Sequence, residues 1–219
     1  MKWNIKGNPD FGQLDIELGP GEKFVSESGS MAYMSSGMKL KSKLIGGLWS
    51  ALVRKIVGGE SLFAGEYSHP AGGSVTFSPN RPGTVMNRTL ANEVFIMTAG
   101  SYMASSPGIK LKTRFGGIRA LFSGEGAFVV EASGTGELFF NSYGAIVEKH
   151  VSGDFTVDTG HVVAWDPGLD YEVRTVGGLK SMLFSGEGLV LRFTGEGTVY
   201  TQTRTMGGLS HWLTPFSGR

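Results

Sequence analysis

Three stretches of the chain alternate regularly between apolar and polar residues. Residues 38–44, 109–115 and 169–173 place hydrophobic side chains at every second position and mostly charged or polar ones between them. Because successive side chains of a β-strand point to opposite faces, this alternation predicts three strands, each with one packed face and one face in water. A turn that favours type II geometry precedes each strand, at Ser36-Gly37, Pro107-Gly108 and Pro167-Gly168.

Glycine pairs recur at one point of this pattern. They follow the alternating strands at Gly46-Gly47, Gly116-Gly117 and Gly177-Gly178, 70 and 61 residues apart. Each pair is followed by two further glycine turns, and the second of these, at Gly72-Gly73, residues 134–136 and residues 195–197, is expected to close a hairpin. The chain therefore reads as one all-β domain over residues 1–219, with repeats at about 10–79, 80–150 and 151–205 and a short C-terminal tail.

A unit of about four strands cannot bury its apolar face alone and leaves open sheet edges. Closure on neighbouring units removes those edges. We therefore expect three pseudo-symmetric sandwich or barrel units packed around a pseudo-threefold axis, and a homo-oligomer, as a trimer or a multiple of one.

The segment after each glycine pair is apolar and basic together, and its spacing predicts short helical turns with an amphipathic character. Residues 207–213 repeat the start of this segment near the C-terminus. Such helices dock on membrane surfaces, but they also pack inside a protein or its oligomer, and the second role is favoured. The candidate apolar contact residues are Leu48, Trp49, Leu52, Ile118, Leu121, Phe122, Leu179, Met182, Leu183 and Trp212.

The charged faces of the alternating strands form the second candidate surface. Two of the strands are basic, whereas the third carries Asp170, Glu172 and Arg174. The basic positions could line a groove for phosphate or RNA, but aromatic residues are not interleaved with them, which favours solvated strands or charge-matched pairing with a neighbour. The candidate basic residues are Lys39, Lys41, Lys43, Lys110, Lys112 and Arg114.

Composition narrows the class of protein. Glycine makes up 35 of 219 residues and charged residues only 18%, which favours short strands and tight turns. A net charge of +1 provides no global field for nucleic acid, so we expect no nucleic-acid partner. Cysteine is absent, no apolar run is long enough to span a membrane, and the first 18 residues lack the apolar core of a secretion signal. These features predict a cytoplasmic protein.

Catalytic patterns are missing from the sequence. The four histidines, His69, His150, His161 and His211, are too scattered for a metal-binding pair, and His161 is read as a strand-end residue. Neither a GxSxG elbow nor a cysteine nucleophile occurs. The Gly124-Glu125-Gly126 stretch fits a turn better than a phosphate loop, and Glu60, Glu125 and Glu187 fit structural turn positions. We therefore expect no catalytic residue, no metal and no cofactor.

Several short motifs together resemble one protein family. They are Pro20-Gly21-Glu22, residues 27–34, Gly46-Gly47-Leu48 and the Gly-Glu-Gly turns. The set is similar to the altered-inheritance-of-mitochondria 24 family, whose prokaryotic members are largely uncharacterised, over about residues 14–203. The resemblance implies a fold like that of the tryptophan RNA-binding attenuator, three repeats in one chain and trimeric or higher assembly. For mitochondrial relatives it implies a role in inner-membrane organisation, and it supplies no catalytic residue.

The sequence thus predicts a non-enzymatic, oligomeric scaffold or interaction protein of unknown pathway, and leaves open peripheral membrane contact through the apolar segments. The alternative is a protein that binds a small ligand or RNA, in cavities at the repeat junctions or on the basic strand faces.

Overall fold

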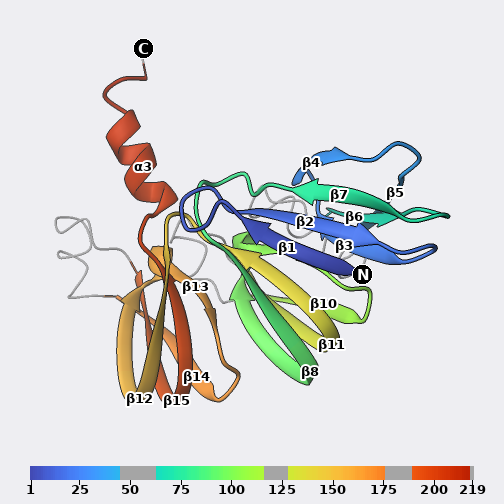
Figure 1. Ribbon diagram of the computed structural model, residues 1–219. Coiled ribbons are helices and arrows are strands. Elements are labelled where there is room, and N and C mark those ends of the chain that lie inside the picture. The colour runs from blue at the N-terminus through green and yellow to red at the C-terminus, as the bar shows by residue number, and fades with distance from the viewer. Residues whose placement is uncertain (45–62, 116–127, 176–188, 218–219) are drawn as a thin grey trace.

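The computed structural model describes residues 1–44, 63–115, 128–175 and 189–217, which form mainly β-strands (Figure 1). The prediction of an all-β fold is confirmed. One antiparallel sheet has the strand order β1 (Lys2–Lys6), β2 (Gln13–Leu18), β7 (Gly73–Phe77) and β4 (Met31–Met34). This four-stranded sheet is built entirely from the first third of the chain.

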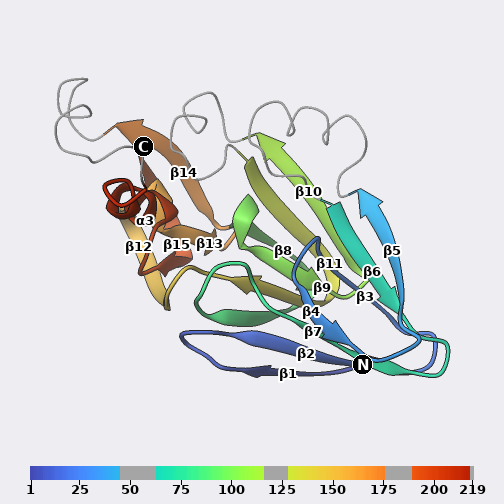
Figure 2. The same ribbon diagram turned by 90° about the horizontal axis from the view of Figure 1, so that it is seen from above.

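A larger sheet runs through the whole molecule. Its strands in the described residues follow the order β12 (Ile146–Asp158), β15 (Leu189–Gln202), β13 (Val162–Trp165), β8 (Val85–Thr98), β11 (Phe128–Asn141), β9 (Tyr102–Ser105), β3 (Lys23–Glu27), β6 (Phe63–Ser68) and β5 (Lys39–Leu44). Two more strands lie off this path, with β10 (Ile109–Phe115) on β11 and β14 (Leu169–Thr175) on β15. Figure 2 shows β12 toward one end of the molecule and β5 toward the other.

The three alternating strands of the sequence are β5, β10 and β14, as predicted. Each forms an antiparallel pair with the strand that follows it in the described chain, namely β6, β11 and β15. The pleat follows the alternation, because Leu111 is half-buried while Lys110 and Lys112 on either side are exposed. The glycine pairs, the helical turns expected after them and the turn acids Glu60, Glu125 and Glu187 lie outside the described residues.

The hairpins expected at residues 134–136 and 195–197 are wrong. The chain continues through both sites, and β11 and β15 are single strands of 14 residues each. The glycines mark the place where each strand changes partner: β11 pairs with β10 up to Gly134 and with β9 from Leu138. A Cβ atom at Gly134 would lie 2.3 Å from the carbonyl oxygen of Gly108, so glycine is required there for a close backbone approach.

The first third of the chain behaves differently at the corresponding place. A turn separates β6 from β7, but these strands belong to different sheets and do not form the predicted hairpin. The turns before the alternating strands also vary. Gly37 adopts a positive φ of 82°, as a type II turn requires, whereas Gly108 and Gly168 do not adopt a positive φ. Glycine is required at residue 108 for lack of space instead, because a Cβ atom there would lie 2.3 Å from the Thr135 carbonyl oxygen.

One pair of hydrogen bonds occurs in all three thirds of the chain, and we call it the turn clamp. The residue that begins each turn donates its backbone N–H to a carbonyl on a strand beside it, and its side-chain oxygen accepts the N–H of the same strand residue. The partners are Ser35 and Ser74 (2.9 and 3.0 Å), Ser106 and Glu137 (2.8 and 3.0 Å), and Asp166 and Thr198 (3.0 and 2.9 Å). Around Glu137 and Thr198 the turn clamp satisfies backbone groups where β11 and β15 change partner.

Three clusters of buried side chains make up the core. One contains Phe95, Phe140 and Tyr200, whose ring centroids lie 5.3 to 5.7 Å apart. A second lies beneath the four-stranded sheet, around Phe24, Phe77 and Phe139, and the third surrounds Trp165 and Phe193. Arg88 joins the first cluster to the turn between β13 and β14, which contains Asp166. It lies 4.5 Å from the Phe95 ring centroid, pairs with Asp166 at 3.0 Å and donates to the Tyr200 hydroxyl at 3.1 Å.

The C-terminal tail forms helix α3 (Met206–Leu213), which projects from the body of the protein (Figure 1). Thr205 caps its N-terminus by accepting the N–H of Gly208 at 3.0 Å, and none of its residues is buried. Among the helices of the described residues, none has the length and apolar character needed to cross a membrane.

Candidate functional site

The candidate site is the side of the molecule at which the alternating strands end. In Figure 2 the arrowheads of β5, β10 and β14 all point to this side, and β6, β11 and β15 start from it. We call it the hairpin edge. Because each of its three strand pairs is antiparallel, the chain leaves the described fold and re-enters it at this same edge three times.

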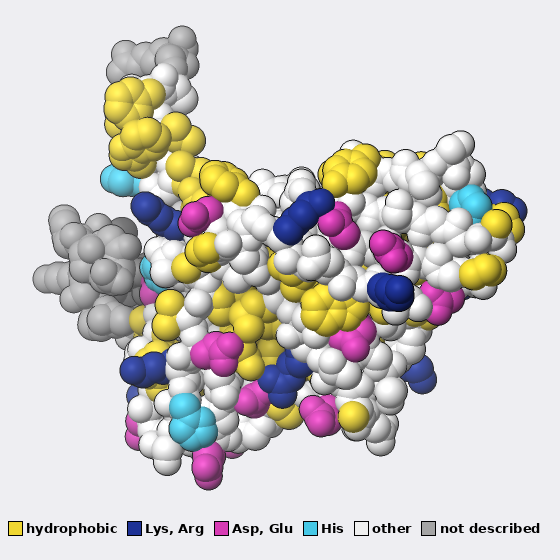
Figure 3. All heavy atoms as spheres, viewed as in Figure 1, with side chains coloured by type: hydrophobic (Ala, Val, Ile, Leu, Met, Phe, Trp, Pro, Cys, Tyr) yellow, Lys and Arg dark blue, Asp and Glu magenta, His cyan; other side chains and the backbone are white. Residues whose placement is uncertain are grey.

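The predicted apolar contact residues fall almost entirely outside the described part of the chain. Trp212 is the exception, and it is 63% exposed on α3. It lies beside Phe216, whose ring centroid is 5.5 Å away. Figure 3 shows hydrophobic side chains gathered along this helix. The residues outside the described ranges are Leu48, Trp49, Leu52, Ile118, Leu121, Phe122, Leu179, Met182 and Leu183.

The predicted basic faces are exposed where the structure describes them. Lys39 and Lys41 on β5, and Lys110 and Lys112 on β10, all point to solvent, whereas the side chains of Lys43 and Arg114 are outside the description. Their strand register places an acid opposite the central lysine of each face. Lys41 lies opposite Glu66 on β6, and Lys112 lies opposite Glu131 on β11.

The third strand pair at the hairpin edge, β14 and β15, carries the same charge pair with its signs reversed. Glu172 on β14 lies opposite Arg192 on β15, and the two side chains approach to 3.3 Å. Arg174 also pairs with Glu172, and its hydrogen bond, followed by that from Arg192, holds the pKa of the Glu172 carboxyl below its usual range. The central position of each hairpin is thus charge-matched across strands, which favours ordinary pairing over a continuous groove for phosphate.

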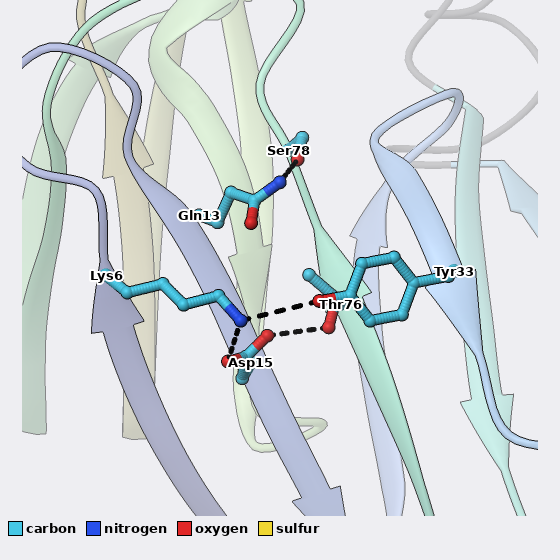
Figure 4. A network of polar contacts seen from close by, with 6 residues as sticks. All are labelled: Lys6, Gln13, Asp15, Tyr33, Thr76 and Ser78. Atoms are coloured by element: carbon cyan, nitrogen blue, oxygen red, sulfur yellow. Dashed lines mark hydrogen bonds and ion pairs between the residues drawn. The ribbon is translucent and has the colours of Figure 1, made fainter.

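The outer face of the four-stranded sheet holds a polar network that the sequence analysis missed (Figure 4). The ammonium of Lys6 pairs with Asp15 at 2.7 Å and lies 3.4 Å from the Tyr33 hydroxyl, while Thr76 donates to Asp15 at 2.6 Å. Partial burial raises the pKa of the Asp15 carboxyl, but hydrogen bonds from Lys6 and Thr76 outweigh it and lower the pKa overall. The polar alternation of residues 13–17 was the available signal, but the strand partners could not be inferred from it.

This network makes stability depend on pH in a defined direction. Replacement Asp15→Asn should lower the free energy of unfolding by about 1 kcal/mol or less near neutral pH, because the pair is partly exposed. The carboxylate has a lowered pKa when folded, so its contribution is present above the unfolded pKa and is lost as the pH falls through the folded value. Urea unfolding from roughly pH 6 to roughly pH 3 should show the difference shrinking. An equal deficit for the exposed control Asp10→Asn would contradict this origin.

A cavity lies between α3 and the body of the protein. Its volume is about 550 Å³, and its lining includes Tyr143, His161, Arg204 and Trp212. His161 directly precedes β13, as predicted for a strand-end residue, and its Nδ1 donates to the Gln202 carbonyl oxygen at 2.6 Å. The lining contains Arg204 and His161 but no carboxylate, which suits an anion better than a cation. In the described ranges, His, Asp and Glu side chains form no group of three that could hold a metal ion.

Comparison with known proteins places the chain in a family. Residues 3–204 match the family described as mitochondrial biogenesis AIM24. An uncharacterised protein of Streptococcus pyogenes serotype M6 is 31% identical over 212 residues, which is 93% of this chain and 86% of that protein. A crystal structure of a Streptococcus pyogenes protein superposes with a TM-score of 0.83 at 29% identity, covering 98% of this chain and 99% of that one. The chain therefore belongs to the AIM24 family.

Proposed function

We propose that this protein is a non-enzymatic, cytoplasmic scaffold that assembles with further copies of itself and contacts a membrane surface peripherally from its hairpin edge. The observation that carries the proposal is that β5, β10 and β14 end on one side of the molecule (Figure 2). Three contacts on one side act together, so weak individual contacts add through avidity. The family description names biogenesis and no reaction, which agrees with a scaffold.

We further propose that residues of about 10–79, 80–150 and 151–205 are three pseudo-symmetric, attenuator-like units. The turn clamp supports this, since each third of the chain has the same pair of bonds, one to a backbone carbonyl and one to a side-chain oxygen. The central charge pair of each hairpin supports it too, because the pair stays matched when its signs reverse.

Membrane contact is proposed for the sequences that connect the hairpin strands, because they combine apolar residues such as Trp49 and Phe122 with Arg54, Lys55 and Arg119. Apolar side chains bury in the interface while cations attract anionic lipid. The exposed charges of β5 and β10 flank these sequences, whereas the third hairpin contributes Asp170 and Glu172, so attraction is expected mainly from the first two.

The test is flotation of the purified protein with anionic liposomes, combined with light scattering. The variant Trp49→Ser, Leu52→Ser, Phe122→Ser should lose at least about tenfold in partitioning, because each buried apolar side chain contributes about 1.5–3 kcal/mol. The control Phe11→Ser removes a side chain that is 73% exposed elsewhere, and it should float like the wild type.

The opposite result has a specific meaning. If the wild type does not bind liposomes and the triple variant loses its fold or assembly, the connecting sequences are structural and membrane contact is wrong. A second candidate, binding of a small anionic ligand, would then take first place. Its supporting observation is the cavity beside α3, with Arg204 and His161 and no carboxylate in its lining.

A further inference from the structure

Two strand junctions join the thirds of this chain to one another. At the first, β9 pairs with β3, with Ala104 opposite Ser26 and Ser105 opposite Val25. At the second, β13 pairs with β8, with Ala164 opposite Met97 and Trp165 opposite Ile96. Both junctions are antiparallel and short, and they link consecutive thirds into the larger sheet.

The two junctions use corresponding positions. In β9 and β13, Ala104 and Ala164 each stand two residues before a turn-clamp residue, Ser106 or Asp166. In their partner strands β3 and β8, Ser26 and Met97 each stand two residues after a buried phenylalanine and three before a glycine. The junction register is therefore defined by local landmarks that can be sought elsewhere in the chain.

A third set of these positions exists, but its two members are not paired with each other. Tyr33 stands two residues before the clamp residue Ser35, in β4, and Val157 stands two residues after Phe155 and three before Gly160, in β12. In the described residues β4 ends the four-stranded sheet and β12 ends the larger one, so each has one unpaired edge. Figures 1 and 2 both show the two strands far apart, so the chain does not close on itself here.

Burial distinguishes the open positions from the two completed junctions. Ala104, Ala164 and Trp165 are 0% exposed and Ser105 is 1% exposed. At the corresponding positions of β4, Tyr33 is 55% exposed and Met34 is 40% exposed. Large apolar side chains therefore stand in water at positions that are covered at both completed junctions, which is typical of an interaction surface.

The other free edges carry charges that oppose strand addition. The β1 edge has Lys2 and Lys6, β5 has Lys39 and Lys41, and β14 has Asp170 and Glu172. Charged side chains on edge strands are the usual protection against pairing between chains. Met31–Met34 in β4 contains no charged residue, whereas in β12 the uncharged residues 155–157 lie between Asp154 and Asp158. Of these edges, β4 is the one whose strand carries no charge.

We infer that β4 of one copy pairs with β12 of a second copy, antiparallel and in the register of the two internal junctions, with Tyr33 opposite Val157 and Met34 opposite Thr156. The inference rests on the self-assembly part of the proposed function and specifies its interface. The contact is heterologous, because two different surfaces of the chain meet. Repetition of it generates a ring if the rotation closes and a filament if it does not.

Cysteine cross-linking tests the register directly, since the chain has no cysteine of its own. Residues directly opposite in an antiparallel pair have Cβ atoms close enough for a disulfide. The double variant Tyr33→Cys, Val157→Cys should form a covalent ladder of multimers on mild oxidation. The matched control Tyr33→Cys, Val147→Cys places the second thiol at an exposed position ten residues away on β12, about 33 Å along the strand, and should remain uncross-linked.

A second variant tests whether self-association depends on this strand pairing. Tyr33→Glu, which changes an exposed side chain, should weaken self-association about tenfold or more by light scattering, while Phe11→Glu should leave it unchanged. If the wild type assembles but neither the cross-link nor the Tyr33→Glu effect appears, this junction is wrong and the scaffold stands. A wild type that stays monomeric at every concentration overturns both the junction and the self-assembly in the proposed function, whatever liposome flotation shows.

Discussion

Replacement of Gly134 by alanine should be among the most damaging single substitutions in this protein. Gly134 has a φ of 118°, which L-residues rarely adopt, and its Cβ would lie 2.3 Å from the Gly108 carbonyl oxygen. That oxygen belongs to the backbone and cannot move without disturbing the turn before β10. Strain and overpacking together should lower the free energy of unfolding by about 3–5 kcal/mol, measured by denaturant titration.

Gly153 provides the control that isolates the contact. It lies in β12 with a similar φ of 103°, but a Cβ there would meet nothing within 4 Å. Gly153→Ala therefore carries the cost of the backbone conformation alone and should lose about 1–2 kcal/mol. Equal losses in the two variants would show that conformation alone accounts for the need for glycine at residue 134.

Removal of the Trp165 side chain should have an effect of similar size. Trp165 is fully buried, and its ring packs against those of Tyr171 and Phe193 at centroid distances of 5.0 and 5.4 Å. Trp165→Ala should lower the free energy of unfolding by about 3–5 kcal/mol, the range for a large aromatic core residue. In a domain of this length, thermal unfolding should shift down by roughly 10 °C.

Two further variants test whether the loss comes from ring packing. Trp212→Ala removes the same side chain from an exposed position and should change stability by about 0.5 kcal/mol or less. The Trp165 Nε1 has no hydrogen-bond partner in the described residues, so Trp165→Phe keeps most of the packing without losing a bond and should cost much less than alanine. A phenylalanine variant as unstable as the alanine variant would contradict the packing explanation.

The alternating strands were predictable because their signal is local. Lys110, Leu111 and Lys112 show which face of β10 is packed without reference to any other part of the chain. Glycine in a strand carries no such information. The same Gly-x-Gly sequence fits a hairpin turn and a close approach of two backbones, and only the contact of Gly134 with the Gly108 carbonyl oxygen distinguishes them. The expected hairpin at residues 134–136 was wrong for this reason.

The candidate site was predictable in composition but not in arrangement. The change from Lys112 to Glu172 is visible in the sequence, and charge-matched pairing was considered for these faces. The matching change from Glu131 to Arg192 on the partner strands acquires a meaning only when the register is known. The turn clamp was also beyond local reasoning, because Ser106 and Glu137 are 31 residues apart and meet through tertiary structure.

The two strands that change partner also determine how the backbone exchanges amide hydrogens with solvent. β11 is paired with β8 along one edge and with β10 and β9 along the other, and the turn clamp holds the gap between them. β15 is enclosed in the same way by β12, β14 and β13. Amides of these strands open only when whole neighbouring strands detach, so their slowest exchange reports global unfolding, whereas the outward amides of β12 report the state of one edge alone.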